Sequence, residues 1–231
     1  MADEYSYFDL KSIQFGLRWI QEIRALRKGG LPVPALDWDV VYVFSGPEIT
    51  LEEGPHDTKL GYNQNKNRLL AGFDIAREVT ALRLGIETNT ISFSDIQKHG
   101  PKVYFDGWPH QNESFKDLKK KGTLSRDFGF PDDSLIVGSP VEIVNTGDQV
   151  RNLLVNEWQD ARKIIFVSDL YHLPRTKRYF GTEGTPRISP ERCIFSFPRN
   201  SKVSVKIALG EIRRFRLYVL KGFITENTLW D

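Results

Sequence analysis

The segment of residues 164–180 constrains the fold of this chain more than any other part of its sequence. It begins with the apolar run 164–167, continues with Ser168 and Asp169, and reaches His172 before a proline and a turn rich in cations. A continuous apolar run is typical of a strand buried on both faces of a parallel sheet, and ligands of open α/β sheets bind where such strands end. The segment therefore predicts a ligand site at the carboxyl end of an inner strand.

The cations of this segment follow Pro174, and proline is favoured at the first position of a helix. They are Arg175, Lys177 and Arg178, all in the first turn of the expected helix. The helix dipole is positive at that end and favours anions. Three cations there predict an anionic group among them, such as the phosphate or carboxylate of a ligand.

Apolar runs alternate along the chain with segments of helical periodicity. The runs predict strands at 40–44, 102–105, 135–137, 164–167 and 193–197. Residues 48–62, with three glutamates and two glycines, predict a loop. The helical segments predict helices at 5–28, about 64–83, 112–121, about 147–160 and about 203–221. This alternation predicts an α/β fold with a mostly parallel sheet and helices on both faces. We expect one domain over residues 1–231, with the first and last of these helices packed on it as appendages.

Composition argues against several classes of protein. The net charge of +2 with 27% charged residues does not favour nucleic acid or an anionic membrane as a partner. The single cysteine, Cys193, rules out an internal disulfide and is expected to be an inert buried thiol in a reducing compartment. The N-terminal residues show no leader pattern, and no run of about 18 apolar residues occurs, so we expect a cytoplasmic protein.

Three of the apolar runs end in a pair of small or polar residues. Each pair alone is an ordinary turn. However, small residues let a ligand approach the backbone, and a hydroxyl or carboxylate just past a strand can hydrogen-bond it. Together the pairs predict one concave site along an edge of the sheet, formed by Ser45-Gly46, Asp106-Gly107 and Ser168-Asp169.

Three further polar residues each allow a structural and a functional interpretation. Thr146 and Gln149 have the spacing of a capping box, so they either cap a helix or donate polar groups into the site. Glu113 is either a carboxylate that suits the first turn of a helix or a group that takes part in the chemistry.

The tryptophans fall into two groups. Trp19 and Trp158 lie on the apolar stripes of their helices and are expected in the core. Trp108, between a glycine and a proline at a strand end, is expected to cover a ligand by stacking.

His172 is the histidine that most favours a functional role. It lies in the loop that leaves a buried strand, where an imidazole can act as an acid, a base or a donor to an anion. Magnesium held by Asp106, Asp169 and His172 is an alternative because oxygen ligands suit this ion, but no spacing motif supports it. The motifs of dinucleotide-binding dehydrogenases, P-loop NTPases, zincins and α/β-hydrolases are absent from the sequence.

The stretch Val167–Arg175 resembles the V-T-S-x-Y-H-x-x-R signature of a bacterial family typified by YdcF, SanA and ElyC. Other motifs occur in a similar order over about residues 40–180. The family has an early arginine in the helix after its first strand, a glutamate after its second strand, and a T-x-x-N motif at a later helix. The matching positions here are Gly46 and Arg68, then Asp106, Gly107 and Glu113, then Thr146 and Gln149.

Two positions depart from the family pattern, because Asp106 replaces a usual serine and Gln149 a usual asparagine. The resemblance implies a Rossmann-like three-layer sandwich, with S-adenosylmethionine as a ligand suggested for YdcF. The anchored relatives SanA and ElyC are linked to the cell envelope. We expect this chain to be more similar to the YdcF branch, since its sequence shows no membrane anchor.

Two functions remain open from the sequence. The first is an enzyme, a transferase or a phosphoester or pyrophosphate hydrolase, that acts on a phosphorylated or nucleotide-type ligand. His172 would move a proton, and Asp106 or Glu113 would orient the substrate. The ligand would be lined by Ser45, Gly46, Arg68, Gly107, Trp108, Thr146, Gln149, Ser168, Asp169 and Arg175.

The second function is a module that binds a nucleotide-like ligand without turnover and has a regulatory or envelope-related role. A third interpretation uses the basic helix 203–221 as an interaction surface, although its cations are expected to form a solvated face.

Overall fold

The computed structural model describes residues 10–46, 58–138, 143, 146–152, 160–180, 188–201 and 203–227, which contain a five-stranded sheet. All strand pairs are parallel, and the order across the sheet is β3-β2-β1-β4-β5. The strands match the apolar runs and are β1 (Trp38–Phe44), β2 (Lys102–Asp106), β3 (Leu135–Val137), β4 (Lys163–Val167) and β5 (Cys193–Ser196).

The described helices are α1 (Leu10–Gly29), α2 (Thr58–Leu84), α3 (Phe93–His99), α4 (Pro109–Lys120), α5 (Thr123–Phe128), α6 (Thr146–Asn152), α7 (Leu173–Tyr179) and α8 (Val205–Leu220). Within the part of the chain that the structure describes, no helix is both long enough and apolar enough to cross a bilayer.

Two helix boundaries differ from the sequence-based expectation. The expected loop 48–62 is too long, because α2 begins at Thr58 and takes Gly61 into the helix. The helix expected to begin at Asn112 begins at Pro109 instead. The backbone N–H of Trp108, just before this helix, donates to Gln111 Oε1 at 3.1 Å. Residues 153–159 of the expected helix 147–160, including Trp158, lie outside the described residues.

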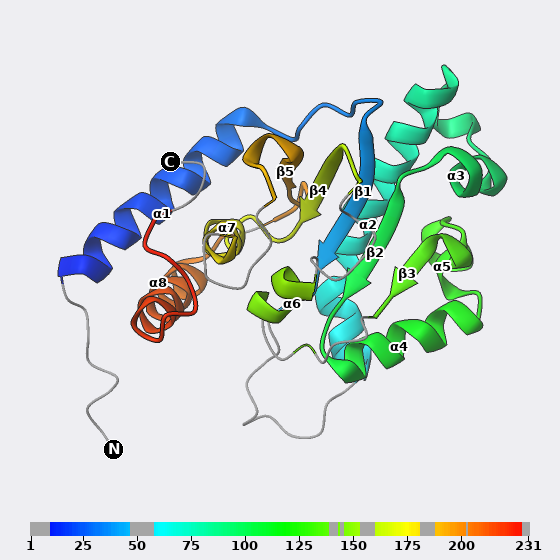
Figure 1. The fold of residues 1–231 in the computed structure, drawn as a ribbon. Coiled ribbons are helices and arrows are strands. Elements are labelled where there is room, and N and C mark those ends of the chain that lie inside the picture. Colours follow the sequence, from blue (N-terminus) through cyan, green and yellow to red (C-terminus); the bar gives the residue numbers. More distant parts are fainter. Residues whose placement is uncertain are drawn as a thin grey trace.

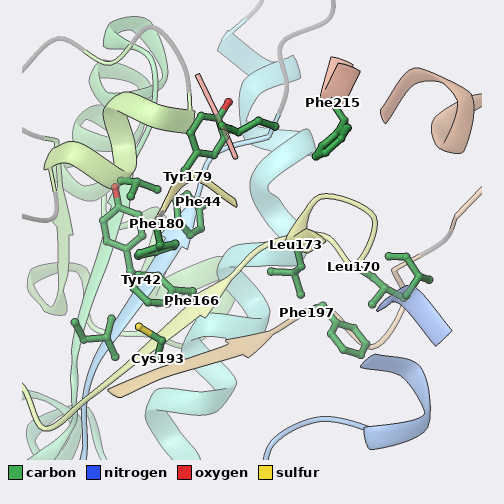
Figure 2. Close-up of a cluster of buried hydrophobic side chains, with 14 of the residues drawn as sticks. Tyr42, Phe44, Phe166, Leu170, Leu173, Tyr179, Phe180, Cys193, Phe197 and Phe215 are labelled. Carbon is green, nitrogen blue, oxygen red and sulfur yellow. The ribbon is translucent and has the colours of Figure 1, made fainter. Parts of the chain in front are cut away.

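Alternate residues of β1 face two separate hydrophobic clusters. Val40, Tyr42 and Phe44 belong to a cluster that side chains of α1, α6, α7 and α8 complete. Figure 2 shows part of this cluster, with Leu173 and Tyr179 of α7 and Phe215 of α8. Val41 and Val43 belong to the opposite cluster, to which α2, α3, α4 and α5 contribute. Helices therefore cover both faces of the sheet (Figure 1), and the chain forms the α/β, Rossmann-like three-layer sandwich expected from its sequence.

The longest helix, α2, approaches β1 closely at a glycine. A Cβ at Gly72 would lie 2.8 Å from Cγ2 of Val43, so no larger residue fits without a shift of the helix or of the Val43 side chain. This close approach keeps the first turns of α2 next to the carboxyl end of β1, where the predicted site lies.

The terminal helices α1 and α8 lie side by side on one face of the sheet (Figure 1). Phe15 of α1 stacks on Phe215 of α8, and both rings join the hydrophobic cluster of that face. Trp19 and Ile23 complete the buried face of α1, which confirms the expectation for Trp19. A second apolar stripe of α1 is exposed, and it contains Leu10, Ile13 and Leu17.

Candidate functional site

The strand order reverses between β1 and β4. From β1 the chain adds β2 and β3 on one side, and it then crosses over to add β4 and β5 on the other side. The helix α2, between β1 and β2, lies on one face of the sheet, whereas α6 and α7, which flank β4, lie on the opposite face. In open α/β sheets, ligands bind in the crevice outside the carboxyl ends of the strands at such a switch point.

Two asparagines that follow the strands cap the ends of β1 and β2. The N–H of Gly46 donates to Asn65 Oδ1 at 2.6 Å, and the N–H of Gly107 donates to Asn112 Oδ1 at 2.9 Å. Asn112 also donates to Asp106 Oδ1 at 3.0 Å, which orients that carboxylate. The sequence analysis missed both asparagines as part of the site. For Asn112 the signal is an amide in the first turn of the helix that follows β2, whereas Asn65 lies well inside α2 and has no such signal.

Gly107 allows the ends of β1 and β2 to touch. A Cβ at this position would lie 3.1 Å from the Cβ of Ser45 and would clash with Gln111 Oε1. The small residues at these two strand ends therefore permit a close approach of backbone, as their pattern indicated.

One turn of α6 connects these strand ends with the end of β4. Gln149 Nε2 donates to Ser45 Oγ at 2.8 Å and to the backbone oxygen of Asp106. Thr146, three residues earlier, has its Oγ1 3.4 Å from Nε2 of His172. The structure thus directs both side chains of α6 to the strand ends, and their role as donors to a ligand stays a prediction.

His172 is buried beside the end of β4. Its Nδ1 lies 2.9 Å from Ser168 Oγ, so each ring nitrogen faces a hydroxyl group. Burial holds the pKa of His172 well below its ordinary value. The positive charges of neighbouring arginines lower this pKa further, and Arg175 has a larger effect than Arg68. The imidazole is therefore neutral at pH 7, with one nitrogen that can accept a proton and one that can donate.

An ion pair joins the ends of β1 and β4 across the switch point. Arg68 Nη2, from α2, lies 2.5 Å from Asp169 Oδ2, and Nη1 donates to the backbone oxygen of Phe44 at 3.0 Å. The guanidinium is fully buried, and its Nε has no hydrogen-bond partner within the described residues. Arg68 thus ties the two strands together, and its contact with a ligand stays a prediction.

The cations that follow Pro174 face carboxylates of the terminal helices. Arg175 Nε donates to Glu211 Oε2 at 2.9 Å, and both side chains are almost fully buried. Arg178 pairs with Glu22 at 2.5 Å, donates to the backbone oxygen of residue 226, and lies against the rings of Phe15 and Phe215. At two of the three cations, the protein itself therefore supplies an anionic group.

Sequence reasoning missed Glu211. It is the single acidic residue of α8 and stands among cations, which indicated a solvated basic face instead of a buried pair. The role of Arg175 in binding a ligand stays a prediction, and its ion pair with Glu211 gives it a structural role as well.

Glu113 and Trp108 differ from the buried residues of the predicted site. Glu113 is exposed on α4 and pairs with Lys116 at 3.0 Å. Trp108 is half-buried at the start of α4, with its ring edge-on to His110. The catalytic role of Glu113 and the stacking role of Trp108 stay predictions.

A metal centre gains no support from the described residues. Among them, no group of three or more His, Cys, Asp or Glu side chains is placed to hold a metal ion. Cys193 is buried in β5, and burial raises the pKa of its thiol to about 12, so the thiol is protonated and unreactive, as expected.

Comparison with known proteins assigns no family to this chain. No protein-family model matches it, and no curated protein or solved structure matches it significantly. The likeness to the family typified by YdcF therefore rests on the residues of this sequence, and the candidate site rests on its geometry.

Proposed function

We propose that this chain is an enzyme that acts on a phosphorylated or nucleotide-type small molecule, bound outside the carboxyl ends of β1, β2 and β4. The observation that carries the proposal is the convergence of buried polar side chains from these strand ends at the switch point of the sheet. Buried polar groups are costly unless they are paired, so such a concentration of them favours a binding site over a purely structural edge.

His172 is the residue that we assign to proton transfer. Its contact with Ser168 is short, at 2.9 Å, whereas its contact with Thr146 is long, at 3.4 Å. A substrate group can replace the weaker contact with the smaller loss. In the tautomer in which Nδ1–H donates to Ser168, Nε2 can take a proton from a nucleophile and return it to a leaving group.

Positive charge near His172 supports an anionic ligand. The charges of Arg175 and Arg68 both disfavour protonation of the ring, and the carboxylates of Glu211 and Asp169 offset part of each field. Fixed positive charge of this kind stabilises negative charge that develops on a phosphoryl group. It favours a nucleotide over S-adenosylmethionine, whose sulfonium is cationic, although the family resemblance makes both worth testing.

Thermal-shift measurements with inorganic phosphate, AMP, ADP and S-adenosylmethionine test binding, because a ligand stabilises the folded state by RT ln(1 + [L]/Kd). We expect a nucleotide to raise Tm and to be converted on incubation, as followed by phosphate release and chromatography. His172→Asn should lower kcat by about a hundredfold or more while the ligand still raises Tm. His99→Asn, at an exposed position on α3, is the matched control.

A binding module without turnover is the second candidate function. The burial of His172, whose side chain is only 2% exposed, favours it, since a catalytic base must reach its substrate. Nucleotide-induced stabilisation without any product would support this alternative. If none of the four compounds stabilised the wild-type protein, both functions would be refuted for this class of ligand.

A further inference from the structure

A cavity separate from the strand-end cluster lies beside the carboxyl end of β5. Its volume is about 420 Å³, within the range of small-molecule sites, and it opens to the surface. One wall is a stripe of α2 that runs from Asn67 to Glu78, and the other walls are residues 31–34 and 196–200. None of the residues predicted for the strand-end site lines this cavity.

The walls of the cavity combine apolar with polar residues, and two of the walls contain prolines. Leu70, Ala71 and Ile75 of α2 form one side. The facing segments read Leu-Pro-Val-Pro and Phe-Pro-Arg-Asn, and each proline has a fixed φ angle. The prolines restrict the backbone of these two segments, which reduces the entropy that they can lose on binding a ligand.

Opposite charges stand on opposite walls. Glu78 and Asp74 belong to α2, whereas Arg199 belongs to the segment after β5. Within the described residues, neither the side chain of Glu78 nor that of Arg199 makes a hydrogen bond or an ion pair. Nevertheless they interact: burial raises the pKa of Glu78, and the charge of Arg199 acts to lower it. The two groups are close enough to sense each other and are not in contact.

This arrangement matches a molecule that carries both charges. We propose that the cavity binds a zwitterion with an apolar body, namely an apolar amino acid or a short apolar peptide. Its ammonium group would face Glu78 and Asp74, its carboxylate would face Arg199, and its apolar part would lie against α2 and the prolines. An arginine fork suits a carboxylate because it can form two parallel hydrogen bonds.

Simpler ligands fit the cavity less well. A purely apolar molecule would cover the half-buried carboxylate of Glu78 without offering it a partner. An anion alone would meet the two carboxylates of α2, and a cation alone would meet Arg199. Asp74 already pairs with Arg77 at 2.9 Å, so Glu78 is the main partner of the ammonium group.

Calorimetric titration of the full chain with L-leucine and with L-leucyl-L-leucine tests the proposal and distinguishes an amino acid from a peptide. The better of the two is then compared with its N-acetylated form, which lacks the ammonium group, and with its carboxamide, which lacks the carboxylate. We expect one saturable site and a loss of about tenfold in affinity for each blocked form. Absence of binding by both zwitterions would overturn the proposal, as would equal affinity for a zwitterion and either blocked form.

Two variants test which wall of the cavity binds the ammonium group of the ligand and which binds its carboxylate. Glu78→Gln should weaken the zwitterion about tenfold and leave the N-acetylated form unchanged. Arg199→Gln should weaken the zwitterion by a similar factor and leave the carboxamide unchanged. Glu87→Gln and Arg24→Gln, at exposed positions outside the cavity, are matched controls that should change nothing. The assignment would be wrong if Glu78→Gln weakened the N-acetylated form as much as the zwitterion. It would also be wrong if Arg199→Gln weakened the carboxamide as much as the zwitterion.

The proposal does not depend on the function of the strand-end site. His172→Asn should leave the binding of the zwitterion unchanged, because His172 does not line the cavity. A loss of zwitterion binding in this variant would show that the ligand occupies the strand-end site and would overturn the assignment.

Discussion

The two halves of the candidate site are built with different chemistry. At the ends of β1 and β2, the glycine N–H groups are held by the neutral amides of Asn65 and Asn112. At the end of β4, the contacts come from groups that carry or exchange protons: the imidazole of His172 and the ion pairs of Asp169 and Arg175.

The β1–β2 half therefore holds the backbone in position, and the β4 half contains the groups that can react. Hydrogen bonds between neutral amides do not change with pH, so the Gly46–Asn65 and Gly107–Asn112 contacts keep their geometry over the whole physiological range. The β4 half depends on the protonation of a buried ring and on buried charges, which are strongly destabilising when one partner is lost. We therefore expect changes in the two halves to differ both in size and in their response to pH.

The largest effect is expected at the buried pair of Arg175 and Glu211. Glu211→Gln should lower the free energy of unfolding by about 3–5 kcal/mol, because it leaves a buried guanidinium without its counter-charge. Urea unfolding measures the change. The double variant Arg175→Met with Glu211→Leu should recover most of it, since replacing a whole buried pair is often neutral.

Arg175→Ala distinguishes this structural role from the anion-binding role predicted from the sequence. The ion pair predicts a loss of stability with and without a nucleotide present. Wild-type stability in the absence of ligand, together with loss of ligand-induced stabilisation, would favour the anion-binding role instead.

A steric change in the β1–β2 half should have a smaller effect that is the same at every pH. Gly107→Ala places a Cβ against Ser45 and Gln111, and we expect it to lower stability by about 1–3 kcal/mol. The loss should be equal in urea unfolding at pH 7.5 and pH 5.5. Gly210→Ala, in the interior of α8 with open space around it, is the control and should stabilise by about 0.5–1 kcal/mol.

The pH response should appear at His172. Its pKa is lower in the folded than in the unfolded state, so the unfolded state binds more protons as the pH falls below about 6.5. The contribution of His172 to the free energy of unfolding is therefore fully present above that pH and is lost as the pH falls below it. Between pH 7.5 and pH 5.5, the wild-type protein should lose about 1 kcal/mol more than His172→Asn. Parallel pH profiles of the two proteins would contradict this account of the ring.

The smallest effect is expected at Glu113. Its ion pair with Lys116 is exposed, so Glu113→Gln should change the free energy of unfolding by less than about 0.5 kcal/mol. The same variant tests the catalytic role predicted from the sequence. Unchanged turnover would remove Glu113 from the mechanism and leave proton transfer to the β4 half alone.

The sequence predicted the fold well because the decisive signals are local. The runs that form β1 and β4 are short, strongly apolar and bounded by turn residues, so their positions and burial follow from composition alone. Parallel strands then place their carboxyl ends at one edge, which is why Ser45, Asp106 and Ser168 could be grouped from their positions in the sequence.

The partners of the polar groups could not be predicted in the same way. Arg175 and Glu211 are 36 residues apart, and their meeting depends on how α8 packs across α7. On α1, two apolar stripes compete, and only packing against Phe215 decides that the stripe with Phe15 and Trp19 is the buried one. Such choices depend on helix packing, which residue spacing does not specify.

The contacts of Arg178 have a consequence for the order in which the protein is assembled during synthesis. This side chain, close to the C-terminal end of α7, binds Glu22, lies against the rings of Phe15 and Phe215, and reaches the backbone of residue 226. The contacts of α1 therefore form only after α8 has been synthesised, and contacts over such a long sequence separation form late. A chain that stops before α8 contains every predicted site residue, yet we expect the turn that carries His172 to remain open to protease until α8 is made.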